Sequence, residues 1–153
     1  MASLPDSVAV SQVLSGLLGK QVGVQIGAPF DTEAAGTLGV YLRGDEVVAL
    51  CFMDMSLSNQ AGAALSMIPA GVAAEGASNG TIEDNLLENL SEVLNIGAQW
   101  FSADGERVAL GGVSVAPSDF PEQVRSILTS PGARGDFEVE IPGYGGGRMT
   151  VLS

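Results

Sequence analysis

A helix predicted over Thr81–Trp100 carries the residues that could do chemistry. At about 100° per residue, its apolar side chains fall in one broad sector, and its polar side chains Glu88, Glu92, Asn95 and Gln99 cluster on the opposite side. Glu92 and Asn95 are three residues apart, so their side chains are neighbours on the helix surface. A partner that docks on this face would meet two carboxylates and two amides together. The alternative is an ordinary solvated helix face, because Glu-x-x-Asn alone fixes only two residues.

The rest of the composition limits the chemistry that this face could do. The chain has no histidine, which excludes Ser-His and Cys-His catalysis and His-rich metal sites. Its one cysteine, Cys51, lies in the apolar run Val47–Met53, where a buried thiol behaves as a small hydrophobe. Any reaction would therefore use carboxylates, amides, hydroxyls or groups supplied by a partner.

Length and charge point to a single acidic domain. The 153 residues predict one domain spanning 1–153, and 46% hydrophobic residues are enough for a sizeable core. A net charge of -12 repels the phosphates of nucleic acids and anionic lipids, so we expect neither nucleic acid nor membrane as a partner. An acidic surface suits a partner with an exposed Lys or Arg.

Several features predict a cytoplasmic protein. A single cysteine allows no intramolecular disulfide, which fits a reducing compartment. The first residues, Met1–Asp6, lack the basic and apolar regions of a signal peptide. Glycine and polar residues interrupt every apolar stretch, so no transmembrane helix is expected.

Periodicity and turn residues predict the elements that must position the polar helix. Besides Thr81–Trp100, helices are expected over Ser7–Gly19, Ser58–Ile68 and Asp119–Leu128. Strands are expected over Val22–Ile26, Thr37–Leu42, Val47–Met53, Val108–Val115, Phe137–Ile141 and Arg148–Leu152. The Ala- and Gly-rich segment Ala70–Gly80 is predicted to be a loop.

The order of these elements repeats. A helix, a strand, an Ala-Pro pair and two further strands occur twice, which indicates an internal duplication of an αβββ unit. The predicted fold class is α+β, with one six-stranded antiparallel sheet covered by helices and a pseudo-twofold repeat. We expect the helix over Thr81–Trp100 to pack on the sheet through Leu86, Leu90 and Leu94.

The segment Glu92–Ala98 resembles the signature helix of the CheC/CheX/FliY family of chemotaxis phosphatases, in which Glu-x-x-Asn precedes a stretch of small residues. The family pattern has Asp or Ser four residues before the Glu, where this chain has Glu88. It also has a proline about twenty-two residues beyond the Asn, close to Pro117. Leu14–Val22 is similar to the family's first helix and the start of its first strand, so the resemblance spans most of the chain.

The resemblance implies an activity and a role for each residue of the polar face. The activity would be hydrolysis of the phosphoaspartate of a CheY-like response regulator, in chemotaxis or two-component signalling. Asn95 would hold the attacking water, and Glu92 would pair with a Lys of the regulator. Glu88 and Gln99 would contact the same partner. Mg²⁺ would come with the regulator, so the chain would need no cofactor or metal site of its own.

Family members carry one or two Glu-x-x-Asn helices. A gapless shift that matches Pro29 to Pro117 places Leu4 against Glu92 and Ser7 against Asn95, which implies a single site, as in CheX. The other hypotheses are a non-catalytic adaptor that binds a regulator or a flagellar switch component, and a structural dimer unit. A homodimer is compatible with each of them.

Overall fold

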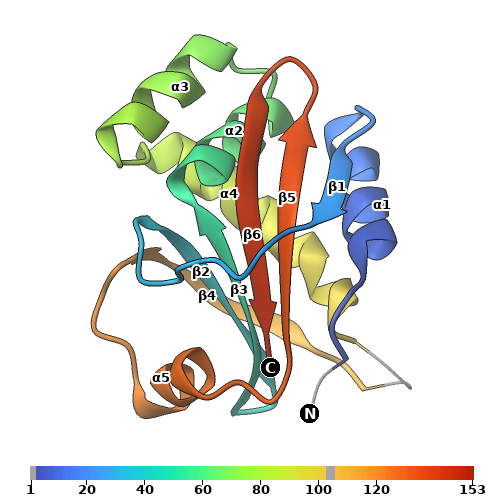
Figure 1. Ribbon diagram of the computed structural model, residues 1–153, viewed down its shortest axis with the longest axis vertical. Helices are drawn as coiled ribbons and strands as arrows, with labels where there is room; N and C mark the ends of the chain where they lie inside the picture. Colours follow the sequence, from blue (N-terminus) through green and yellow to red (C-terminus); the bar gives the residue numbers. More distant parts are fainter. Residues whose placement is uncertain (1–2, 103–105) are drawn as a thin grey trace.

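Six antiparallel strands form one sheet in the computed structural model, which describes residues 3–102 and 106–153 (Figure 1). In their order across the sheet they are β1 (Gly23–Ile26), β5 (Arg134–Ile141), β6 (Gly145–Leu152), β3 (Glu46–Asp54), β2 (Gly36–Arg43) and β4 (Ala109–Ala116). Every neighbouring pair is antiparallel. The predicted α+β fold with a six-stranded antiparallel sheet is therefore confirmed.

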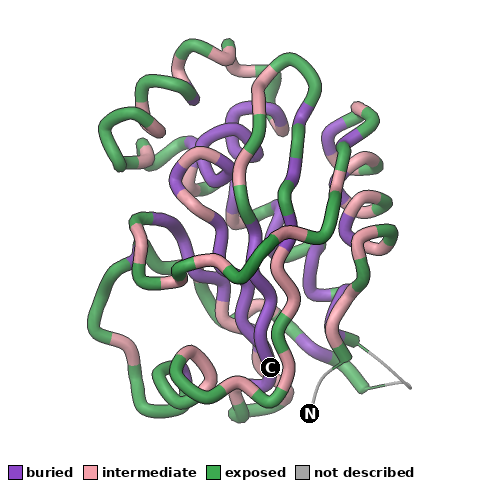
Figure 2. The backbone as a smooth tube through the Cα atoms, in the orientation of Figure 1, coloured by how far each residue is buried: buried purple, intermediate pink, exposed green. Residues whose placement is uncertain are grey.

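Helices cover both faces of this sheet. They are α1 (Ser7–Leu18), α2 (Met55–Leu65), α3 (Ala70–Asn79), α4 (Asp84–Ile96), the 3-10 helix η1 (Gly97–Trp100) and α5 (Glu122–Thr129). The central strand β3 contacts helices on both sides. Cys51 and Met53 join the buried residues of α1 and α4, whereas Leu50 and Phe52 pack with Val124 of α5. Buried residues are concentrated in the central strands β3 and β6 (Figure 2). Because both faces of β3 are covered, its sequence is a continuous apolar run.

The strand order has the predicted pseudo-twofold symmetry. Exchanging β1 with β4, β2 with β5 and β3 with β6 turns the order β1-β5-β6-β3-β2-β4 into its own reverse. Each half of the chain therefore gives its first strand to the other half, and β6 pairs with β3 at the centre. The helices α1 and α4 hold equivalent places, each ahead of the first strand of its half.

The prediction of a loop over Ala70–Gly80 was wrong, because this segment forms α3. Its two glycines lower the intrinsic helix propensity, but alanine is the strongest helix former. Tertiary packing adds to this, since Ala73 is fully buried with Ala63 and Leu86. Gly80 then ends the helix in the left-handed conformation, with φ of 68°.

The predicted helix over Thr81–Trp100 is shorter than expected. It begins at Asp84, with Glu83 at the N-cap position. The carbonyl oxygen of Thr81 accepts a hydrogen bond from Nδ2 of Asn59 at 2.9 Å, which holds Thr81 outside the helix. The α-helix ends at Ile96, and the last four predicted residues form η1. The polar face thus runs over two consecutive elements.

Gly62 allows α2 and α4 to approach closely. A Cβ atom added there would overlap the carbonyl oxygen of Leu86, and Nδ2 of Asn89 donates to the Gly62 carbonyl oxygen at 2.9 Å. We expect Gly62→Ala to lower the free energy of unfolding by about 1–3 kcal/mol, because relief of the overlap separates two packed helices. Urea denaturation measures this change. Gly71→Ala in α3 is the control, since a Cβ added there meets nothing within 4 Å; an equal loss in both variants would contradict the explanation.

Candidate functional site

The structure brings the four polar residues singled out from the sequence to one surface. Glu88, Glu92 and Asn95 are exposed on α4, and Gln99 is exposed on η1. The opposite side of α4 is fully buried through Leu86, Leu90, Val93 and Leu94. Leu90 and Leu94 join the main core as expected, but Leu86 packs with α2 and α3 rather than with the sheet.

Three long-range hydrogen bonds fix the helix that carries these residues. The hydroxyl of Tyr41 on β2 donates to the carbonyl oxygen of Leu94 at 2.7 Å. Burial raises the pKa of Tyr41 well above its usual value, so the phenol stays protonated and remains a donor. Asn89 binds the Gly62 carbonyl of α2, and Nε1 of Trp100 donates to the carbonyl oxygen of Ala9 on α1 at 3.2 Å. A surface held from three sides is suited to positioning a reactant.

The side chains of Glu92 and Asn95 are free to meet a partner. Within residues 3–102 and 106–153, neither forms a side-chain hydrogen bond or an ion pair. As i and i+3 neighbours on a helix, their Cβ atoms lie about 5–6 Å apart. Nε2 of Gln99 donates back to the carbonyl oxygen of Ile96 at 3.1 Å, so this amide is partly engaged.

The electrostatics of this surface favour a basic partner. Neither α1 nor α4 contains a Lys or Arg, and α4 carries Asp84, Glu88 and Glu92. Glu92 lies near the C-terminal end of α4, where the negative end of the helix dipole opposes a carboxylate. A cation placed beside Glu92 by a partner would relieve this unfavourable interaction.

The first half of the chain does not repeat the polar pair. Leu4 and Ser7, which the gapless sequence shift matched to the pair, lie before α1 and at its first residue. When α1 and α4 are compared from their C-terminal ends, Leu14 and Leu17 take these places. With either correspondence, the first half has neither the carboxylate nor the amide.

Sequence reasoning missed a neighbouring feature of the same surface. A shallow hollow of about 350 Å³ lies between α1 and the end of α4, and Gln99 of the polar face is part of its lining. It is lined by Gln12, Val13, Gly16, Leu17, Ile96 and Gln99. The sequence of α1 could have indicated this hollow. The helix has no charged residue, and it has more apolar residues than a single buried stripe along one face would require.

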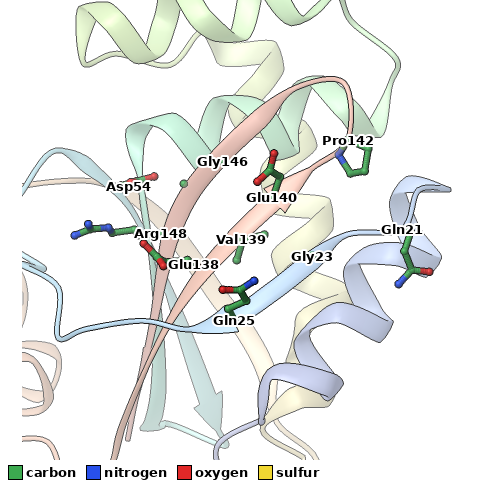
Figure 3. Close-up of a pocket in the computed structure, with 11 residues that line it drawn as sticks. Gln21, Gly23, Gln25, Asp54, Glu138, Val139, Glu140, Pro142, Gly146 and Arg148 are labelled. Carbon is green, nitrogen blue, oxygen red and sulfur yellow. The ribbon is translucent and has the colours of Figure 1, made fainter.

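A larger hollow, of about 730 Å³, lies on the face of β1, β5 and β6 that points away from α4 (Figure 3). Its charged lining residues are Asp54, Glu138, Glu140 and Arg148. Asp54 serves as the N-cap of α2 and accepts from the backbone N–H of Leu57 at 2.8 Å, while burial raises its pKa. Among the described residues, no group of three or more His, Cys, Asp or Glu could hold a metal ion. The candidate site is the surface of α4 and η1, because Glu92 and Asn95 are exposed there.

Comparisons with known proteins show the fold. No protein family model matches the sequence, and no curated protein matches it. The FliM middle domain from H. pylori is similar in structure, with a TM-score of 0.63, 11% identity, and coverage of 95% of this chain and 83% of that one. A chain of the FliG–FliM complex from H. pylori gives a TM-score of 0.62, with 12% identity and coverage of 95% and 85%. Thermotoga maritima FliY gives 0.56, with 15% identity and coverage of 93% and 80%.

These likenesses confirm at the level of the fold the resemblance seen in the sequence. None of the helices in the described part of the chain is long and apolar enough to cross a membrane. The interpretation of Met1–Asp6 falls partly on residues 1–2, outside the described residues, and stays a prediction.

Proposed function

We propose that this chain is a phosphatase that removes the phosphoryl group from the phosphoaspartate of a CheY-like response regulator in chemotaxis. The observation that supports this most is the exposed pair Glu92 and Asn95, which lies side by side on a fixed helix without partners among the described residues. The fold shared with FliM and FliY is compatible with a role in this signalling system. The site residues carry the functional assignment, since a fold alone does not.

The proposed reaction is in-line hydrolysis of the acyl phosphate. Water attacks phosphorus, the bond between phosphorus and the aspartyl oxygen breaks, and the products are inorganic phosphate and the regulator's free carboxylate. The Asn95 carboxamide both accepts a hydrogen bond from the water and donates one to it, so it fixes the direction of attack. An amide is not a general base near neutral pH, so Asn95 acts by positioning.

Glu92 would bind rather than react. Its carboxylate would pair with a Lys of the regulator and hold the two proteins in register, and Glu88, one turn earlier, would add to the attraction. Gln99 would contact the regulator at the other end of the face. Mg²⁺ bound by the regulator would neutralise charge on the phosphoryl group, which requires no metal site in this chain.

The test is a phosphate-release assay with the receiver domains of the organism that encodes the chain. Each receiver is phosphorylated with a small-molecule donor, and loss of the phosphoryl group is followed with and without the protein. We expect at least one receiver to lose its phosphoryl group faster when the protein is present. Tight binding to receivers without any faster release would contradict the phosphatase proposal.

A non-catalytic adaptor is the second candidate. The observation that favours it is the similarity to a chain of the FliG–FliM complex, since that complex joins two different proteins. An adaptor of this kind would use the same acidic surface to bind a regulator or a switch component. In the assay above it would bind a receiver and leave its phosphorylation lifetime unchanged.

A further inference from the structure

The hollow between α1 and the end of α4 adjoins the proposed reaction site. Ile96 and Gln99 form one side of it, and Ile96 lies one turn after Glu92 on α4, so the two side chains are neighbours on the helix surface. Val13, Gly16 and Leu17 of α1 form the other side. A partner that reaches Glu92 would therefore meet this hollow at the same time.

Hydrogen bonds hold the two walls of the hollow in place. Trp100 on η1 binds the Ala9 carbonyl of α1, as described above. On the other side of α1, Oγ of Ser11 donates to the carbonyl oxygen of Val22 at 2.7 Å, and the backbone N–H of Val22 donates to Oγ of Ser15 at 3.0 Å. The hollow is thus preformed, so a ligand would bind without the cost of ordering it.

Gly16 is one of the α1 residues that line the hollow, and it has no side chain to fill it. It lies inside a helix, where glycine is less favourable than alanine. A Cβ added at Gly16 would meet nothing within 4 Å, so packing inside the protein does not require a glycine there. An open surface position that lacks a side chain despite this cost is suited to receiving a side chain from outside.

The surface around the hollow combines exposed apolar side chains on α1 and α4 with carboxylates farther along α4. Val8 on α1 is 60% exposed and Ile96 is 41% exposed. The α1 helix has no charged residue, whereas α4 presents Glu88 and Glu92. A partner that places an apolar side chain in the hollow and a basic group toward Glu88 and Glu92 would complement both parts of this surface.

We propose that the hollow receives an apolar side chain of the same receiver domain that Glu92 and Asn95 engage, next to a basic residue of that domain. This inference rests on the proposed function and adds the feature that selects among receivers. Glu92 attracts any receiver with a suitably placed cation, whereas the hollow discriminates by the size and polarity of the neighbouring side chain. A receiver with an acidic residue at that position would be disfavoured, because its charge would lie near Glu88 and Glu92 of α4.

The first test fills the hollow from within. Gly16→Trp is expected to raise the dissociation constant for a receiver loaded with beryllium trifluoride and Mg²⁺ by about tenfold or more. Gly16→Ala adds one methyl group and should weaken binding less. Gly71→Trp in α3 is the matched control, because an added Cβ there also meets nothing within 4 Å, and it should bind as the wild type does. Wild-type affinity in Gly16→Trp would overturn the inference.

The second test locates the partner by thiol protection. The native Cys51 is fully buried and burial raises its pKa to about 12, so it does not compete for a maleimide reagent. A Gly16→Cys variant is expected to label at least about tenfold more slowly when the same receiver is bound, and a Gly71→Cys variant is expected to label at an unchanged rate. Equal labelling of Gly16→Cys with and without bound receiver would overturn the inference.

The two proposals fail in different ways. A receiver that binds and protects Gly16→Cys but keeps its phosphoryl group would overturn the phosphatase and support the hollow as a docking site. If the Gly16→Trp variant bound the receiver with wild-type affinity and still dephosphorylated it, the phosphatase proposal would be supported and the role of the hollow overturned. Failure of the wild type to bind any receiver would overturn both.

Discussion

Replacing Asn95 with alanine is expected to slow receiver dephosphorylation by about 100- to 1000-fold, by analogy with the loss of one oxyanion-hole donor. The affinity for the receiver should change little, because the amide's hydrogen bonds to the attacking water are used in the transition state. The fold should be retained as well, since Asn95 is exposed and has no partner among the described residues.

Asn95→Asp separates shape from hydrogen bonding. Aspartate has nearly the size of asparagine but lacks its two donor hydrogens, and it adds a negative charge beside an anionic phosphoryl group. We therefore expect it to be nearly as inactive as Asn95→Ala. If size alone mattered, the aspartate variant would keep most of the activity.

Stopped-flow measurement of dephosphorylation, together with an affinity measurement for each variant, tests these expectations. Asn85→Ala is the matched control, because Asn85 is also exposed on α4 but lies in its first turn. It should retain the wild-type rate. Wild-type rates for both Asn95 variants would mean that Asn95 takes no part in the reaction. The phosphatase proposal would then fail, although the fold assignment would be unaffected.

Local patterns predicted the strands and most helices because these elements depend on their own periodicity. The predicted strands Thr37–Leu42 and Val47–Met53 correspond to β2 and β3, which pair as a hairpin with Arg43 opposite Glu46. The helix α3 was missed because its stability comes from contacts with α2 and α4 that local propensity does not encode. The position of Leu86 against α2 was missed for the same reason.

One part of the candidate site could be predicted from local sequence patterns, and another part could not. Exposure of Glu88, Glu92 and Asn95 follows from the period of about 3.6 residues and the buried stripe opposite them. The hollow depends instead on the placement of α1 beside η1, which a hydrogen bond across 91 residues of sequence fixes. A local sequence pattern carries no information about a contact between residues so far apart in the chain. Gly16 could therefore be recognised as part of the hollow only from the structure.

Reversing the charge of Glu92 is expected to weaken receiver binding more than Asn95→Ala does. In Glu92→Lys, a like-charge contact with the regulator's Lys replaces an attraction. Truncating one partner of a desolvated charge pair costs about 2–5 kcal/mol, so charge reversal should raise the dissociation constant by roughly 30-fold or more. Stability should not fall, because a cation near the C-terminal end of α4 interacts favourably with the helix dipole.

Calorimetric titration against the beryllium trifluoride-loaded receiver measures the affinity. Glu75→Lys on α3 is the control for the net charge, which both variants change from -12 to -10, since Glu75 is also exposed but lies outside the polar face. We expect Glu75→Lys to lower the affinity only slightly, and this small loss to disappear at high salt, where long-range attraction is screened. The loss in Glu92→Lys should persist, because a contact pair is screened much less. Equal losses in the two variants would mean that the overall acidity attracts the partner and that Glu92 lies outside the interface.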